Sequence, residues 1–133
     1  MTESFEVSAV LPASAERLYK AWLSSRETSA FTGGKAVISP RKGGRFSVWD
    51  GYIEGRNLEL EPHRRIVQSW RTTDFPEGSE DSKIEVTFKK AKGGTSVTIR
   101  HTNIPEDQGE SYRRGWKDYY FEPMKRYFGK KGK

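Results

Sequence analysis

The sequence has no cysteine, only two histidines and no long apolar run. Without cysteine, neither a disulfide nor thiolate chemistry is available. The two histidines, His63 and His101, stand apart and have no cluster of carboxylates around them, so no metal-site pattern is present and no cofactor is expected. The absence of a signal peptide and of a run long enough to cross a bilayer predicts a cytoplasmic protein without membrane insertion.

Catalytic motifs are also missing from the chain. There is no Ser/His/Asp order, no phosphate-binding loop and no paired-carboxylate pattern. Three glutamates, Glu54, Glu59 and Glu85, fall on expected strands, but nothing in the sequence brings two of them together. A cyclase-like acid–base enzyme is therefore the least favoured alternative, and the sequence leaves open whether any catalytic activity exists.

The charge balance of the 133 residues is basic but mixed, with a formal net charge of +6. Three of the positive charges, Lys130, Lys131 and Lys133, lie after the last aromatic residue. Basic residues elsewhere are scattered, and the aromatic residues are needed for the core, so a nucleic-acid partner is not expected. We expect a single domain over residues 1–128 and a flexible basic tail over residues 129–133.

What the sequence does contain is aromatic residues, which make up 13% of the chain. Six of them fall within residues 114–128, a stretch that reads as a helix. At about 100° per residue, one side of this helix forms an apolar arc of roughly 100°. Phe121, Met124 and Phe128 widen the arc, which predicts a broad concave partner surface. The arc contains Tyr112, Trp116, Tyr119, Tyr120, Pro123 and Tyr127. Pro123 also predicts a kink.

The rest of the chain alternates between strand and turn signals. An opening strand ends near Leu11, and Ser14 caps a short helix. Residues 24–31 form a second short helix or a turn, which stops at Gly33-Gly34. About six antiparallel strands follow, with a hairpin or bulge signal at Asp50-Gly51, before the long C-terminal helix. The sequence predicts an α+β helix-grip fold, in which an antiparallel sheet of about six strands wraps around that helix, with two short helices after strand one.

Five segments carry a family resemblance that runs from about Phe5 to Phe128. Together they resemble the C-terminal domain of the activators of the heat-shock protein 90 ATPase and their bacterial single-domain relatives. The segments are residues 29–34, 42–55, 60–71, 75–78 and 115–123.

The resemblance implies the helix-grip fold of the START-like superfamily, whose members include lipid-transfer domains, the birch-pollen allergen and polyketide cyclases. That superfamily commonly holds apolar ligands between the sheet and the long helix. The eukaryotic co-chaperones carry an additional N-terminal domain that contributes most of the ATPase stimulation, and its signature is not found in these 133 residues. We therefore expect this chain alone to stimulate such an ATPase weakly or not at all.

Seven residues are candidates for a ligand site in an elongated cavity between sheet and helix. Each also has an ordinary structural interpretation: the strand tryptophans as core, the histidine as a hydrogen-bonded strand-end residue, and the arginine as a side chain that reaches the edge of the apolar arc. Arg113 could instead be a cation at the cavity mouth that faces an acidic ligand. The candidates are Trp49, Trp70, His101, Tyr112, Arg113, Trp116 and Tyr120.

The favoured function is binding of a hydrophobic or amphipathic small molecule in that cavity. The alternative is modulation of a heat-shock protein 90 type ATPase as a co-chaperone, with that chaperone as partner. The sequence fixes neither the ligand nor the oligomeric state.

Overall fold

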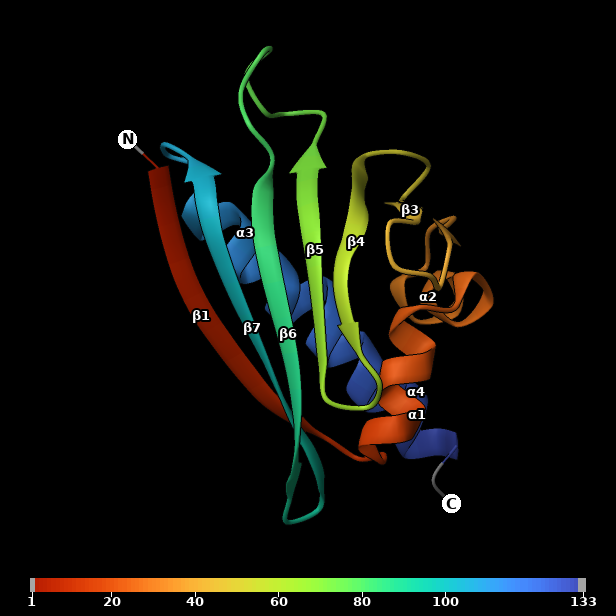
Figure 1. Ribbon diagram of the computed structural model, residues 1–133. Coiled ribbons are helices and arrows are strands. Elements are labelled where there is room, and N and C mark those ends of the chain that lie inside the picture. The colour runs from red at the N-terminus through yellow and green to blue at the C-terminus, as the bar shows by residue number, and fades with distance from the viewer. Residues whose placement is uncertain (1, 132–133) are drawn as a thin grey trace.

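The computed structural model describes residues 2–131, which form seven strands and a helical layer (Figure 1). The described elements are, in chain order, β1 (Thr2–Leu11), α1 (Ala15–Trp22), α2 (Ser25–Thr32), β2 (Val37–Ile38), β3 (Arg45–Val48), β4 (Ile53–Glu61), β5 (Arg65–Thr72), β6 (Ser82–Ala91), β7 (Gly94–Pro105), α3 (Gly109–Gly115), the π-helical segment η1 (Trp116–Phe121) and α4 (Glu122–Lys131).

The seven strands form one antiparallel sheet in the order β1-β7-β6-β5-β4-β3-β2. The expected sheet had about six strands; the two-residue β2 brings the count to seven because it pairs with β3. Strands β2 to β7 follow one another as a meander, whereas β1 returns to pair with β7. The first and last strands are thus neighbours, and β1 is one edge of the sheet.

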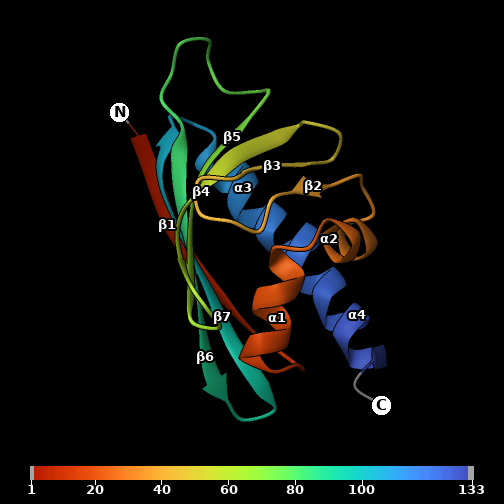
Figure 2. The ribbon, with the colours of Figure 1, turned by 45° about the vertical axis from the view of Figure 1, so that its right-hand side comes forward.

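The helix that runs from α3 through η1 to α4 crosses one face of the sheet, and α1 and α2 lie at the side where α4 ends (Figures 1 and 2). The fold is the expected helix-grip fold. Its core lies between this helical layer and the sheet, where strand residues such as Ile84 and Ile99 are 0–1% exposed. The helix contributes Met124 and Phe128, which are 0% and 2% exposed.

Local sequence signals explain how the first helices begin and end. The side-chain oxygen of Ser14 accepts a hydrogen bond from the backbone N–H of Arg17, and Ser24 accepts one from Glu27 in the same way. Such caps satisfy N–H groups that have no partner inside a helix. Gly33 ends α2 with φ of +80°, a left-handed conformation that glycine adopts without a steric penalty.

The C-terminal helix changes its winding in the middle. In η1 the backbone N–H of Glu122 bonds the carbonyl of Lys117, five residues earlier, and Pro123, which has no N–H, follows directly. Pro123 was expected to kink the helix; the structure shows a wider turn just before it. The helix continues to Lys131, residues 132–133 lie outside the described part, and the flexible tail of residues 129–133 stays a prediction.

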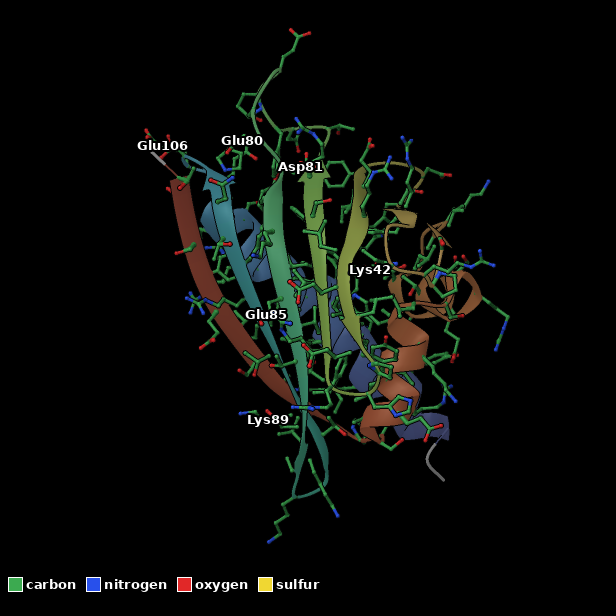
Figure 3. The ribbon with its side chains drawn as sticks, viewed as in Figure 1. Lys42, Glu80, Asp81, Glu85, Lys89 and Glu106 are labelled. Carbon is green, nitrogen blue, oxygen red and sulfur yellow. The ribbon has the colours of Figure 1, made fainter. Side chains whose placement is uncertain are left out.

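The outer face of the sheet carries charged side chains, such as Glu85 and Lys89 of β6 (Figure 3). Arg65 contacts three carboxylates there: Glu85 at 2.5 Å, Glu61 at 2.7 Å and Glu59 at 2.8 Å. These partners raise the pKa of the Arg65 guanidinium, with the hydrogen bond to Glu85 as the main cause. This face is therefore polar and solvated, and the apolar residues gather on the side that faces the helix.

Candidate functional site

Three aromatic side chains, each four residues after the last, attach the C-terminal helix to the sheet. Tyr112, Trp116 and Tyr120 are only 3–8% exposed. The rings of Trp116 and Tyr120 lie 4.8 Å apart, and the ring of Trp70 on β5 lies 4.9 Å from Tyr112 and 5.7 Å from Trp116. The structure therefore brings together four of the seven candidate residues, and His101 joins the same cluster.

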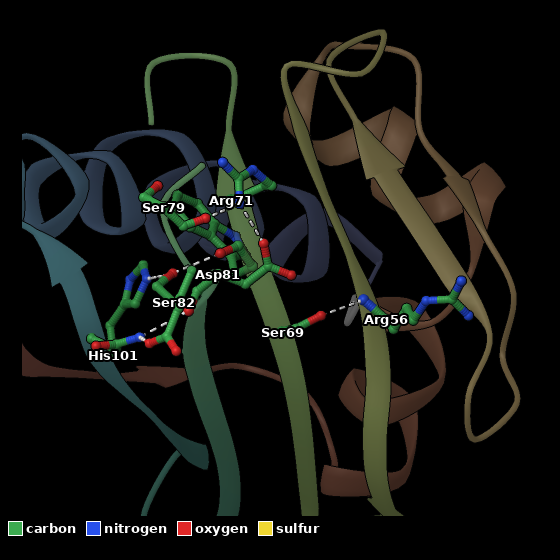
Figure 4. A network of polar contacts seen from close by, with 10 residues as sticks. Arg56, Ser69, Arg71, Ser79, Asp81, Ser82 and His101 are labelled. Carbon is green, nitrogen blue, oxygen red and sulfur yellow. Dashed lines mark hydrogen bonds and ion pairs between the residues drawn. The ribbon is translucent and has the colours of Figure 1, made fainter. Parts of the chain in front are cut away.

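His101 is completely buried at the centre of a chain of hydrogen bonds (Figure 4). The indole N–H of Trp116 donates to His101 Nδ1 at 3.1 Å, and His101 Nε2 lies 2.8 Å from the Ser82 hydroxyl. Ser82 in turn donates to the backbone carbonyl of Trp70 at 2.8 Å. Because Nδ1 accepts, the ring is neutral with its proton on Nε2, which donates to Ser82.

Burial lowers the pKa of His101 to about 3, which agrees with this neutral form. The face of the ring is also enclosed, since Trp70 lies 4.6 Å and Phe5 5.3 Å from it, centroid to centroid. A histidine in this state is poorly suited to exchange protons near neutral pH. Its role is to join β7, β6, β5 and the helix through hydrogen bonds.

A second polar chain lies beside Tyr112, toward the end of β5. The Tyr112 hydroxyl donates to Gln108 Oε1 at 2.6 Å and accepts from Thr72 Oγ1 at 2.7 Å. The hydroxyl of Tyr52 donates to Asp74 Oδ2 at 2.7 Å, and burial, with that bond, raises the pKa of Tyr52 to about 12. Both phenols are thus fixed in place and stay protonated at neutral pH.

Between these polar chains lies a small apolar cleft of about 110 Å³. It is found where the cavity was predicted, under the helix, but drug-sized ligands occupy pockets of about 300–1,000 Å³. The rest of the expected cavity is filled by aromatic rings, including that of Trp22 from α1, which stacks 5.9 Å from Trp116. The cleft is lined by Trp49, Tyr52, Ile53, Trp70, Ser111, Tyr112, Gly115, Trp116, Tyr119 and Tyr120.

Trp49 reaches the cleft from the turn between β3 and β4. Trp49 and Asp50 have φ of +53° and +54°, a region that side chains other than glycine seldom adopt. The indole packs directly on Gly34, where a Cβ atom would lie 2.0 Å from Trp49 Cδ1. Its ring also contacts those of Tyr120 and Tyr119, at 5.9 and 6.1 Å between centroids. The strained turn therefore places Trp49 at the cleft, held by a glycine that no other residue can replace without a shift.

Two predicted positions on the helix do not reach the interior. Tyr119 was expected in the apolar arc but is 61% exposed and lies at the rim of the cleft. Arg113 was expected to reach the edge of that arc or the cavity mouth; its side chain is 56% exposed, lies 3.7 Å from Glu110, and lines a different groove, beside β1. Arg113 thus lies apart from the cleft, and His101, although it contacts Trp70 and Trp116, does not line the cleft either.

The part of the chain that the structure describes contains no group of three or more His, Asp or Glu side chains placed to hold a metal ion. Among the same residues, no helix is both long and apolar enough to cross a membrane.

Comparison with known proteins decides the family. The model of the family described as "Activator of Hsp90 ATPase homolog 1-like protein" matches residues 12–129. The chain belongs to this family.

Curated relatives of this activator family include activator of 90 kDa heat shock protein ATPase homolog 1 from Homo sapiens, which is 35% identical over 116 residues. The match covers 87% of this chain but 34% of the human protein, so the chain spans about a third of the length of that relative. The homologue from Dictyostelium discoideum is 34% identical over 111 residues, and the match covers 83% of this chain and 29% of the Dictyostelium protein.

Solved structures extend the likeness within and beyond the activator family. An HSP90 activator from Plasmodium falciparum has a TM-score of 0.85 and 26% identity, with 95% of this chain and 96% of that chain covered. The structure of Ara h 8.0201 has a TM-score of 0.75 at 15% identity, covering 96% and 97% of the two chains, which shows the shared fold alone.

Several residues of the site were not foreseen from the sequence of this family member. Ser82, Thr72 and Gln108 complete the hydrogen bonds of His101 and Tyr112, but single polar residues near strand and helix ends give no signal of their partner. Tyr52 comes directly after the Asp50-Gly51 turn, and its position next to that signal was the only available hint.

Proposed function

We propose that this chain binds a heat-shock protein 90 type chaperone as a co-chaperone module, and that on its own it modulates the ATPase at most weakly. One observation carries the proposal: the likeness to an HSP90 activator from Plasmodium falciparum that covers nearly all of both chains. Membership in the activator family supports it. The proposed partner is thus a protein rather than a metabolite, and the chain would act as a binding module.

The geometry favours a protein partner over a large apolar ligand. The cleft of about 110 Å³ is well below the usual size of small-molecule sites. The space between helix and sheet is occupied by buried rings that already contact one another, such as Trp22 against Tyr120 at 5.0 Å. A lipid-sized molecule would have to displace these rings, which would remove aromatic contacts from the core.

The expected activity of the isolated chain is weak. The chain spans about a third of the curated human relative, so the full activity of that relative is not expected from it. We expect measurable binding to the chaperone with little or no stimulation of ATP hydrolysis.

A coupled ATPase assay and a calorimetric titration with a purified heat-shock protein 90 type chaperone test the proposal. Ara h 8.0201 is a suitable control, because it shares the fold at only 15% identity. Binding by this chain but not by the control is the expected result. No binding at concentrations near those of the chaperone in a cell would sink the proposal, while a several-fold stimulation would refute only the expected weakness.

A second candidate is binding of a small apolar molecule in the cleft, the function favoured from the sequence. Tyr120 is 6% exposed, yet within residues 2–131 no hydrogen bond of its hydroxyl is found, so a ligand could supply the missing partner. A dry cavity of about 150 Å³ holds one benzene molecule, so the occupant would be no larger than roughly one ring.

Gly115 gives a sharp test of this second function. It lines the cleft, and a Cβ atom there would meet nothing closer than Tyr119 at 4.0 Å. Gly115→Leu should therefore fill the cleft without unfolding the helix, where glycine is itself unfavourable by about 1 kcal/mol. Titration with a fluorescent apolar probe should show binding that this variant abolishes and that Gly129→Leu, a change elsewhere on the helix, leaves intact. Equal binding by both variants would exclude the cleft as the site.

A further inference from the structure

A second hollow, outside the aromatic cleft, lies where the edge strand β1 meets the C-terminal helix. It has a volume of about 480 Å³. One wall is formed by residues 6–9 of β1 and the other by the outward side of the helix. Its lining residues on the helix are Glu110, Arg113, Arg114, Lys117, Phe121, Glu122 and Lys125.

The β1 wall is an unpaired sheet edge. Within residues 2–131, β1 pairs with β7 alone, and both ribbon views show it as the outermost strand (Figures 1 and 2). Its pairing with β7 is regular from Phe5 to Leu11. Proteins usually protect such an edge with lysine, proline or a bulge, but residues 2–11 contain no lysine, arginine or proline, and the one register shift comes before Phe5. The N–H and C=O groups on its open side are available to another strand.

The helix wall is positively charged. It carries four cations and two carboxylates. Glu110 is shared by Arg113 at 3.7 Å and Arg114 at 3.3 Å, and Glu122 lies 3.5 Å from Lys125. For Lys117, no ion pair is found among the described residues. The single carboxylate on the strand side is Glu6, which leaves the lining of the groove with one positive charge in excess.

We propose that this groove binds an extended acidic segment of a partner protein, which adds to β1 as an eighth strand. An added strand would lie about 4.8 Å from β1 and would form the backbone hydrogen bonds that the edge leaves open. Alternate side chains of the segment would point to the helix wall, where acidic ones meet Arg113 and Lys117. Backbone pairing supplies affinity, and the basic wall selects for negative charge.

The charges also explain why a second copy of this chain is a poorer occupant. Two β1 edges paired around a two-fold axis would bring two basic helix walls and two Glu6 side chains toward each other. The chain carries a net charge of +6, so such a pair is repulsive overall. An acidic segment brings no second basic wall: it meets the four cations of the helix wall, and only Glu6 opposes it on the strand side. The proposal does not depend on the identity of the chaperone partner, because a synthetic peptide tests it.

The experiment uses a fluorescein-labelled peptide about as long as β1, in which glutamate alternates with valine and threonine. Fluorescence anisotropy measures its binding at low and at physiological ionic strength. Two control peptides separate the two parts of the proposal: one with lysine in place of each glutamate, and one with alternate backbone nitrogens methylated. We expect binding of the acidic peptide only, weakened by salt, together with slower hydrogen exchange of the β1 amides in its presence.

A matched pair of variants locates the site. Arg113→Glu with Lys117→Glu reverses two exposed charges in the groove, while Lys89→Glu with Lys90→Glu reverses two exposed charges on the β6–β7 hairpin. The first variant should bind the acidic peptide more weakly by on the order of tenfold, and the second should bind it unchanged.

Three results would overturn the proposal. One is equal binding of the methylated peptide or unchanged exchange of the β1 amides, which would rule out strand addition. Another is an equal loss of affinity in both variants, which would show attraction to net charge alone. The third is a stable dimer in sedimentation experiments with the β1 amides already protected, which would show that a second copy covers the edge.

Discussion

The two ends of the C-terminal helix pack on the body of the protein in different ways. At the α3 end, Tyr112 and Trp116 place polar atoms inside the core and hydrogen-bond strand residues, and a cleft of about 110 Å³ remains. At the α4 end, Met124 and Phe128 are 0% and 2% exposed and present no hydrogen-bonding group to the core. The first end is specified by hydrogen-bond geometry, and the second by apolar contact.

At the α4 end, an ion pair between α1 and α2 lies against the side chains of the C-terminal helix. Both terminal nitrogens of Arg17 bond the carboxylate of Glu27, at 2.6 and 2.5 Å, and the Tyr127 hydroxyl donates to the same carboxylate at 2.8 Å. The Arg17 guanidinium also lies 5.1 Å from the centre of the Phe128 ring. Polar groups are therefore buried in the core at the α3 end, whereas at the α4 end they surround the apolar contacts near the surface.

The largest expected effect is at the α3 end. Trp116→Ala removes a ring that contacts Trp22, Trp70 and Tyr120, and it leaves His101 Nδ1 without a donor. We expect a loss of about 3–5 kcal/mol in the free energy of unfolding, a large share of the roughly 5–15 kcal/mol of a typical domain. The sequence alone favoured a smaller loss, because it assigned Trp116 to the roof of a larger pocket.

Trp116→Phe separates packing from hydrogen bonding at the same position. It keeps an aromatic ring but removes the indole N–H, and should cost about 1–3 kcal/mol. Urea denaturation of both variants gives the two values. A loss below about 1 kcal/mol for Trp116→Ala would mean that the ring is not part of the core.

The second prediction concerns the pH dependence that His101 adds to the α3 end. Its pKa is about 3 in the folded state and near 6.5 when unfolded, so below pH 6.5 the unfolded chain takes up a proton that the folded chain refuses. Stability should therefore fall as the pH falls through this window, by about 2 kcal/mol between pH 6.5 and about pH 5. The measurement is chemical denaturation across this range.

His101→Gln and His63→Gln form the matched pair for this measurement. His63 is the only other histidine and is exposed in the turn after β4. His101→Gln should flatten the dependence of the free energy of unfolding on pH between pH 6.5 and about pH 5, whatever the stability of the variant at neutral pH. His63→Gln should leave this dependence as it is in the unmodified protein. A profile that His101→Gln does not alter would show that the buried ring titrates normally.

Local signals predicted the elements well, and the long-range contacts poorly. The cap at Ser14, the short helix that follows Ser24, the stop at Gly33 and the turn at Asp50-Gly51 are all present, because each depends on neighbours within a few residues. The pairing of β1 with β7 spans nearly the whole chain and leaves no local pattern. The size of the cleft depends likewise on Trp22, which arrives from α1.

The faces of the C-terminal helix show why the apolar arc predicted at about 100° per residue was partly wrong. Tyr112, Trp116, Tyr120, Met124 and Phe128 are buried at intervals of four residues, and each such step turns an α-helix by about 40° beyond a full rotation. The wider turn of η1 takes up an additional residue, which rotates the later positions back by roughly 100°. The rotation keeps these five side chains toward the sheet and turns Tyr119 outward.

A smaller effect is expected from the ion pair at the α4 end. Glu27→Gln removes the charge that holds Arg17, whose side chain is 36% exposed, so water replaces part of the lost interaction. We expect a loss of about 1–2 kcal/mol in thermal or urea denaturation at neutral pH. Glu16→Gln, at the exposed pair with Lys20, is the control and should cost less than about 0.5 kcal/mol.

The ion pair also sets a pH window of its own. The hydrogen bonds from Arg17 hold the pKa of Glu27 below its ordinary value of 4.5, so the stabilisation is present above pH 4.5 and is lost as the pH falls through the lower, folded value. The Glu27→Gln variant should therefore lose less stability than the unmodified protein on acidification below pH 4.5. An equal loss in the two proteins would contradict the assignment.

The smallest effect separates two buried phenols on the same face of the helix. The hydroxyl of Tyr112 has two partners, Gln108 and Thr72, so Tyr112→Phe should cost about 1–2 kcal/mol. In the described part of the chain no protein partner is found for the hydroxyl of Tyr120, which lines the cleft, and burial raises its pKa, so it stays protonated. Removing it in Tyr120→Phe should be neutral or slightly stabilising, within about 0.5 kcal/mol. Urea denaturation at neutral pH measures both variants.

A cost above about 1 kcal/mol for Tyr120→Phe would show that ordered water or a bound molecule satisfies the Tyr120 hydroxyl. The α3 end would then hold more water than its contacts indicate.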